Sequence, residues 1–191
     1  MKKNSAASRS ASLIDHLVHL SGMRKRDDLL GGMTLALLET LGAKKVEVFS
    51  LVHDENKRFW LPLTQALEGQ NVRFVSDPMR AEHNMMAPID SDLERLRCLD
   101  RVETVASPPT PARAAHLTRF PMTLAEGTTL WGVAEIESQQ ALSQAEITDV
   151  TRLLSMHGNM LDMLDYSECD ALTGLWNRKP FDDLFYKTLK P

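Results

Sequence analysis

The first part of the chain alternates apolar and polar positions with a helical period. Leu13, Leu17 and Leu20 recur at spacings of four and three, which is typical of one apolar helix face. A second helical pattern begins near Asp27 and stops at Gly42, because glycine readily ends a helix. The pattern therefore predicts two successive helices at the start of the folded region.

The period then changes to two, which indicates strands. Residues 46–51 and 59–63 alternate apolar and polar side chains on either side of a polar turn at 53–57, and this pattern predicts a hairpin. Pro62 lies inside the second strand and has no N–H to donate to a neighbour. That strand must therefore lie at a sheet edge or contain a bulge.

The middle of the chain is less regular and ends in a second hairpin. Short strands are expected at 72–75 and 102–106, and a capping box at Ser91 opens a short helix between them. Residues 116–124 and 128–137 again alternate around a Gly-containing turn, which is typical of a hairpin.

The longest helical pattern follows a capping box formed by Ser143 and Glu146. Five apolar residues and one histidine continue at alternating spacings of three and four, which is typical of a coiled-coil seam: Ile147, Val150, Leu154, His157, Leu161 and Leu164. We interpret residues 143–169 as a signalling helix that forms a homodimer. The same spacing would also suit a single helix packed on a sheet.

Antiparallel strands with an apolar face need helices to cover them, so the predicted fold class is α+β. The order of helix pair, hairpin, irregular segment, hairpin and long helix resembles a GAF domain over roughly residues 12–160. We assign residues 12–142 to a GAF-like sensory domain, whose antiparallel sheet is flanked by helices, with the long signalling helix after it. A PAS domain is the nearest alternative.

A motif near the end of the chain carries a more specific resemblance. Its fixed positions, with Phe181 following, match the opening of GGDEF-type diguanylate cyclase domains: Asp170, Leu172, Thr173, Gly174, Leu175, Asn177 and Arg178. The resemblance implies that residues 170–191 are the start of a cyclase that makes cyclic di-GMP from two GTP. The chain contains no Gly-Gly-Asp/Glu-Glu-Phe sequence, so we assign no catalytic residue, expect this chain to be inactive, and give the motif a coupling role.

The resemblance also implies a place for a small ligand, between the sheet and the irregular middle segment. Candidate lining residues are aromatic or methionine side chains, which equally suit an ordinary core: Trp60, Phe74, Met85, Met86, Phe120 and Trp131. The family implies cyclic nucleotides, tetrapyrroles, haem, small metabolites or no ligand. Cys98 is followed by Leu99 rather than histidine, which disfavours a bilin, and His83 or His116 could ligate haem iron.

Composition narrows the remaining alternatives. The 191 residues include 43% hydrophobic and 25% charged residues with no long apolar run, so we expect a cytoplasmic protein without a membrane segment. We expect residues 1–11 to form a disordered basic tail. The remainder of the chain is acidic, which argues against nucleic-acid binding by the domain. The two cysteines, Cys98 and Cys169, are far apart. That separation disfavours a metal site, a disulfide and a stand-alone GAF-type reductase.

Overall fold

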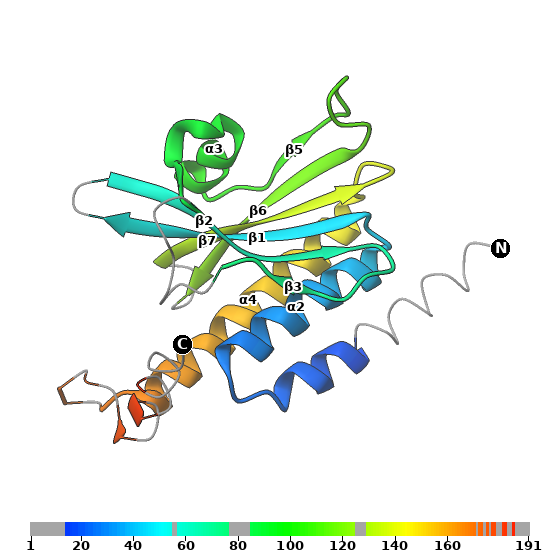
Figure 1. Ribbon diagram of the computed structural model, residues 1–191. Coiled ribbons are helices and arrows are strands. Elements are labelled where there is room, and N and C mark those ends of the chain that lie inside the picture. The colour runs from blue at the N-terminus through cyan, green and yellow to red at the C-terminus, as the bar shows by residue number, and fades with distance from the viewer. Residues whose placement is uncertain are drawn as a thin grey trace.

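The computed structural model describes residues 14–54, 57–76, 85–124 and 129–170, together with residues 172, 173, 175, 177, 178, 181, 182 and 185. An antiparallel sheet forms the middle layer (Figure 1). Two long helices, α2 and α4, cover one face of this sheet, and the short helix α3 lies over the other (Figure 1). The predicted α+β class is confirmed.

The helices begin and end largely where the sequence signals place them. A helix over residues 14–21 precedes α2, Arg26–Leu41, which ends at Gly42 with a φ of 56°. The long helix α4, Gln144–Glu168, begins with the predicted capping box at Ser143. None of the described helices is both long and apolar enough to span a bilayer.

The cap of the middle helix differs from the prediction. Helix α3, Leu93–Arg101, is capped by Asp92, whose carboxylate accepts the backbone N–H of Arg95. Ser91, the predicted cap, instead belongs to the preceding 3-10 turn η2, Ile89–Ser91. Either side chain can cap a helix, and the guanidinium of Arg119 beside Asp92 favours the one that ionises.

The strands run in the spatial order β3-β2-β1-β7-β6-β5, with β4 also paired to β2. The two predicted hairpins are β1 with β2 and β6 with β7, and every pairing between these strands is antiparallel. The second hairpin's turn lies outside the described residues. The strand bounds are β1 Lys45–Asp54, β2 Lys57–Leu67, β3 Arg73–Phe74, β4 Ala87–Pro88, β5 Val105–Ser107, β6 His116–Leu124 and β7 Thr129–Ser138.

Two bulges interrupt the hairpins. The β1–β2 register shifts at Phe49, the residue opposite Pro62, so of the two predicted possibilities, a sheet edge or a bulge, the structure has a bulge. The β6–β7 register shifts after Met122, where Trp131 is left as the extra residue. Strict alternation would place Trp131 with Val133 under α3. The bulge instead turns its side chain toward the helices α2 and α4.

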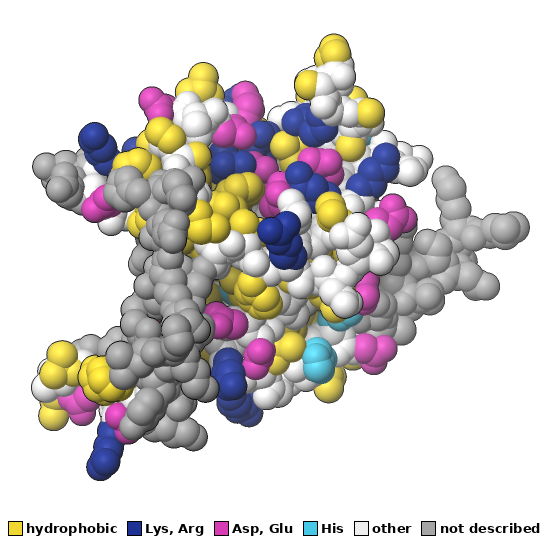
Figure 2. Space-filling view, viewed as in Figure 1, with side chains coloured by type: hydrophobic (Ala, Val, Ile, Leu, Met, Phe, Trp, Pro, Cys, Tyr) yellow, Lys and Arg dark blue, Asp and Glu magenta, His cyan; other side chains and the backbone are white. Residues whose placement is uncertain are grey.

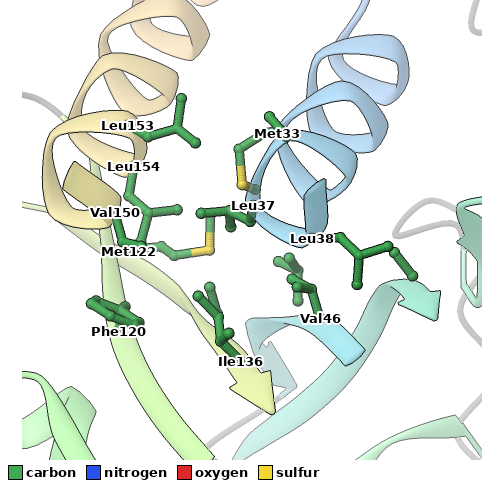
Figure 3. Close-up of a cluster of buried hydrophobic side chains, with 14 of the residues drawn as sticks. Met33, Leu37, Leu38, Val46, Phe120, Met122, Ile136, Val150, Leu153 and Leu154 are labelled. Atoms are coloured by element: carbon green, nitrogen blue, oxygen red, sulfur yellow. The ribbon is translucent and has the colours of Figure 1, made fainter. Parts of the chain in front are cut away.

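The main core lies between the sheet and its helix-covered face. It combines side chains from both long helices with those of the central strands (Figure 3). Its members labelled in Figure 3 are Met33, Leu37, Leu38, Val46, Phe120, Met122, Ile136, Val150, Leu153 and Leu154. We call this side of the sheet the helix face and the side under α3 the α3 face.

Candidate functional site

The α3 face has a small apolar core of its own. Trp60 of β2 is fully buried there, and its indole N–H donates to the carbonyl of Ile89 over 2.9 Å. Cys98 and Leu99 of α3 and Val133 of β7 complete the buried cluster. Trp60 therefore lies between the sheet and the middle segment, where the ligand site is predicted. Its side chain, however, packs against other side chains of the protein.

Four charged side chains surround this small core. Glu135 Oε1 accepts from Arg95 Nε at 2.9 Å and from Arg119 Nε at 3.0 Å, and all three residues are less than a tenth exposed. Arg119 also reaches Asp92, with 3.0 Å from Nη2 to Oδ2. Two guanidinium groups thus meet two carboxylates, which leaves the cluster balanced in charge.

The pKa of Asp92 reflects this surrounding. Burial alone would raise the pKa of this carboxyl, but the hydrogen bond from the Arg95 backbone and the charge of Arg119 outweigh it and hold the pKa below its usual value. Asp92 is therefore ionised while it caps α3, and it connects the helix to β6 through Arg119.

The guanidinium of Arg95 also stacks on aromatic rings. Its Cζ lies 3.6 Å from the centroid of the Phe49 ring and 5.4 Å from that of Trp60. These distances are within the range of a cation–π contact. The space between α3 and the sheet next to Trp60 is therefore filled by the protein's own arginine.

The six predicted ligand residues do not line one cavity. Trp60 lies on the α3 face, whereas Phe120 and Trp131 pack on the helix face. Phe74 is 50% exposed and its ring packs over Gly31 of α2. The two remaining residues lie at the surface or partly buried in the segment before α3: Met85 and Met86.

A hollow on the surface lies elsewhere, where β2 begins next to β4. It has a volume of about 510 Å³ and is open to solvent. Its lining combines basic, acidic and apolar residues: Lys57, Arg58, Phe59, Pro88, Ile89 and Asp90. None of the six predicted ligand residues lines it. In the space-filling view, acidic and basic side chains are interspersed around α3 and β5, without a patch of one sign (Figure 2).

The other candidate chemical groups are poorly placed for reactions. Cys98 is buried, and burial raises the pKa of its thiol to about 12, so it is not a nucleophile near neutral pH. His116 is half-buried on β6, and His83 lies outside the described residues. Within the described ranges, no three His, Cys, Asp or Glu side chains are grouped to hold a metal ion.

The predicted dimer seam of α4 faces the protein's own sheet. Val150, Leu154, His157 and Leu161 are 8% exposed or less and belong to the helix face or contact it. The two outer positions are partly buried against the same core: Ile147 and Leu164. The alternative of one helix packed on a sheet is therefore what the structure contains, and these residues are not available to a partner helix.

His157 is an unusual member of this buried stripe. Its ring is stacked on Trp131, with 6.0 Å between the centroids, and neither ring nitrogen has a hydrogen-bond partner in the described part of the chain. The indole N–H of Trp131 is also unpartnered among the described residues. Burial lowers the pKa of His157 to about 4, so the ring is neutral at pH 7.

The next residue, Gly158, brings α4 close to the sheet. A side-chain carbon built at this position would lie 2.3 Å from the carbonyl oxygen of Thr123 in β6. That contact is impossible, so only glycine allows this approach. Helix α4 therefore rests on β6 beside the bulge that carries Trp131.

The GGDEF-like motif makes direct contact with the last turn of α4. Asp170 Oδ1 accepts the backbone N–H groups of Leu172 and Thr173 and the Thr173 hydroxyl, at 2.8–3.2 Å. Asn177 returns to the helix, where its Nδ2 donates to the Ser167 carbonyl over 2.9 Å. The motif thus forms a turn with Asp170, Thr173 and Asn177, and Asn177 attaches this turn to the end of α4. We call this turn the clasp.

Similar solved structures decide the fold. The GAF domain of a phosphoenolpyruvate-protein phosphotransferase from Acinetobacter matches with a TM-score of 0.63 and 12% identity, over 90% of this chain and 99% of that one. The corresponding domain from Coxiella burnetii matches with a TM-score of 0.63 and 14% identity, over 85% and 97%.

The chain has the GAF fold. A GAF domain/HD domain protein from Geobacter sulfurreducens also matches, with a TM-score of 0.56 and 15% identity over 77% of this chain and 98% of that one. The interpretation as a GAF rather than a PAS arrangement is thereby confirmed for the fold. No protein-family model and no curated protein matches the chain, so the resemblance of its last residues to a cyclase start stays a prediction.

Sequence reasoning missed the charged cluster of the α3 face. Arg95 and Glu135 are 40 residues apart in the sequence, and Arg119 lies between them on another strand. Two signals were available in the sequence, because Arg119 and Glu135 are charged residues inside strands that are largely apolar. Charges in such positions need partners if they are buried.

Proposed function

We propose that this GAF-fold chain is the regulatory part of a diguanylate cyclase, in which α4 carries a signal to a catalytic domain that starts at Asp170. The observation that supports this most is the clasp, because Asn177, one of the residues that match the cyclase start, makes two hydrogen bonds to the end of α4. A movement of α4 would then be transmitted directly to the domain that begins with the motif.

The packing of α4 supports this role. Its inner face is buried in the same core as α2 and the central strands. A shift of α2 or of these strands would therefore displace the whole helix. The chain itself lacks the sequence that would hold Mg2+ and GTP, and we propose that it has no cyclase activity alone.

We also propose a homodimer, formed through the outward side of α4 rather than its buried stripe. The outward positions in the middle of the helix are polar, as at Ser155 and Asn159. Toward the end they become apolar, with Met163 73% and Tyr166 79% exposed. A pair of helices meeting there would place two clasps side by side, which suits an enzyme that joins two substrate molecules.

The dimer is tested by charges on this outward side. Replacing Met163 and Tyr166 together by Glu is expected to halve the mass measured by light scattering, because unpaired carboxylates are costly to bury. The matched control is Ser155→Glu with Asn159→Glu, on the same side of the helix, which should leave the dimer intact. A parent protein that is monomeric at tens of micromolar would refute the dimer.

The regulatory role is tested in a chimera. Residues 1–169 are joined to an active diguanylate cyclase domain that begins with its own copy of the motif, and cyclic di-GMP production is measured. We expect the attached domain to change the rate, and Asp170→Ala to remove that change. The same substitution in the isolated catalytic domain is the control. Equal rates with and without the GAF-fold part would contradict the proposal.

A second candidate function is a coupling module that binds no small molecule on its α3 face. Arg95 favours it, because its side chain occupies the position between Phe49 and Glu135 that a ligand would take. In that case the signal would reach α4 from a neighbouring domain or from the partner copy. The reductase alternative is disfavoured by the buried thiol of Cys98.

A further inference from the structure

The last turn of α4 is held from two directions, by the start of α2 and by the clasp. Arg26, the first residue of α2, directs its guanidinium to Glu168, with 3.1 Å from both Nε and Nη2 to Oε2, and also contacts the carboxylate of Asp165. From the other direction, Asn177 of the clasp donates its backbone N–H to the Glu168 carbonyl and its amide to that of Ser167. The start of α2 lies beside this end of α4 (Figure 1).

The charges explain why an arginine belongs at this place. The C-terminal end of a helix carries a partial negative charge, so cations stabilise it and carboxylates do not. The last turn of α4 contains no basic residue, yet Asp165 and Glu168 add two negative charges to it. Arg26 supplies from another helix the positive charge that this turn lacks.

The exposure of these groups limits their effect on overall stability. The side chains of Arg26, Asp165 and Glu168 are 36%, 46% and 20% exposed. Water and salt therefore screen the attraction, and such pairs contribute little to the free energy of unfolding. Their geometry still constrains the direction in which the last turn points, because two carboxylates share one planar guanidinium.

We propose that Arg26 is a positioning residue, which fixes the last turn of α4 and through it the orientation of the clasp. Arg26 follows the short connection between the first helix and α2. A movement of those two helices would therefore reach the clasp through this one side chain, in parallel with the route through α4. The meaning for signalling rests on the proposed function, whereas the contact itself can be tested without any cyclase.

The test uses the full chain and the hydrogen-exchange rate of the Asn177 backbone N–H, which bonds to Glu168. Arg26→Glu is expected to speed this exchange about tenfold, because local opening becomes easier when the turn is no longer held. Arg26→Lys should give an intermediate rate. Combining Arg26→Glu with Asp165→Arg and Glu168→Arg should return the rate toward that of the parent, since the pairing is restored with reversed signs.

Two controls separate positioning from general damage. Arg152→Glu changes an exposed arginine of α4 that pairs with Asp149 in the same helix, and it should leave the Asn177 exchange unchanged. The amide of Phe120 in the main core reports whether each variant is folded, and Arg26→Gln replaces Arg26→Glu if the latter is not. Unchanged exchange at Asn177 in a folded Arg26 variant, or no recovery in the charge-reversed protein, overturns the proposal. If the exchange rates change as expected but the chimera shows no regulation of cyclic di-GMP production, only the cyclase assignment is contradicted.

Discussion

The two faces of the sheet are held by different interactions. On the helix face, α2 and α4 are attached by a large apolar core, and the buried nitrogens of Trp131 and His157 make no hydrogen bond within the described part of the chain. On the α3 face, the apolar core is small, and Glu135 holds two arginines at 2.9 and 3.0 Å.

This difference indicates which helix can move. Hydrogen-bonded ion pairs hold their partners at fixed distances and angles, so α3 is fixed to the strands below it. Apolar burial is not directional, and a helix attached in that way can shift if its close contacts, such as the one at Gly158, are kept. The helix that leads to the clasp is thus attached to the sheet by contacts that permit movement, whereas its last turn is held by an ion pair, from Arg26 of α2.

The largest expected effect comes from the ionic attachment on the α3 face. Glu135→Ala would leave Arg95 and Arg119 buried without their shared carboxylate, and we expect unfolding to become easier by about 3–5 kcal/mol. The control is Glu137→Ala on the same strand, which removes a partly exposed pair with Lys45 and should cost less than about 1 kcal/mol. Equal losses in urea unfolding would show that the α3 face does not depend on its charges.

The next effect concerns the unpartnered histidine on the helix face. The pKa of His157 falls from 6.5 to about 4 on folding. The unfolded chain therefore takes up a proton between these pH values that the folded protein does not, and stability falls as the pH drops through this window. The shift corresponds to roughly 3 kcal/mol at pH 4, at about 1.4 kcal/mol per pH unit.

His157→Leu isolates this contribution. The difference in unfolding free energy between His157→Leu and the parent should move in favour of the variant as the pH is lowered from 7 to 4. His53→Leu, at an exposed position on β1, should show no comparable trend. A difference that stays constant with pH would mean that the imidazole of His157 has a hydrogen-bond partner or contacts water in the folded protein. The helix face would then be less apolar than the structure indicates.

The smallest effect is at the end of α3. Val102 adopts a left-handed conformation with a φ of 53° and is 48% exposed. This conformation is unfavourable for a β-branched residue, so Val102→Gly should raise the melting temperature, by an amount equivalent to about 1 kcal/mol. Arg101→Gly, one residue earlier within the helix, should lower it instead. A destabilised Val102→Gly protein would show that the side chain matters more than the backbone strain.

The local elements were readable from the sequence because each depends on neighbouring residues. Gly42 ends α2 and the capping box at Ser143 opens α4, and both signals act within one helical turn. The missing N–H of Pro62 predicted either a sheet edge or a bulge, and β2 has a bulge there. The GAF-like order of elements could be assembled from such signals.

The candidate site was harder to predict because it depends on which face each residue occupies. The spacing of Leu154, His157 and Leu161 is the same for a helix pair and for a helix on a sheet, and only the fold shows that they face the sheet. The bulge at Trp131 turns its side chain to the opposite face from the one that strict alternation gives, and no local pattern reveals this. The ion pairs of Arg95 and Arg26 join distant parts of the chain, which no local pattern reveals.

The most direct test of the account is whether the signal passes through α4 as a rigid helix. In the chimera, one, four or seven alanines are inserted directly after Glu168, and cyclic di-GMP production is measured. Each alanine extends the helix and rotates the attached catalytic domain by about 100°, so seven residues return that domain almost to its starting direction. We expect one alanine to change the output strongly and seven to restore it. Output that is the same at all three lengths would contradict the claim that α4 and the clasp couple the two parts.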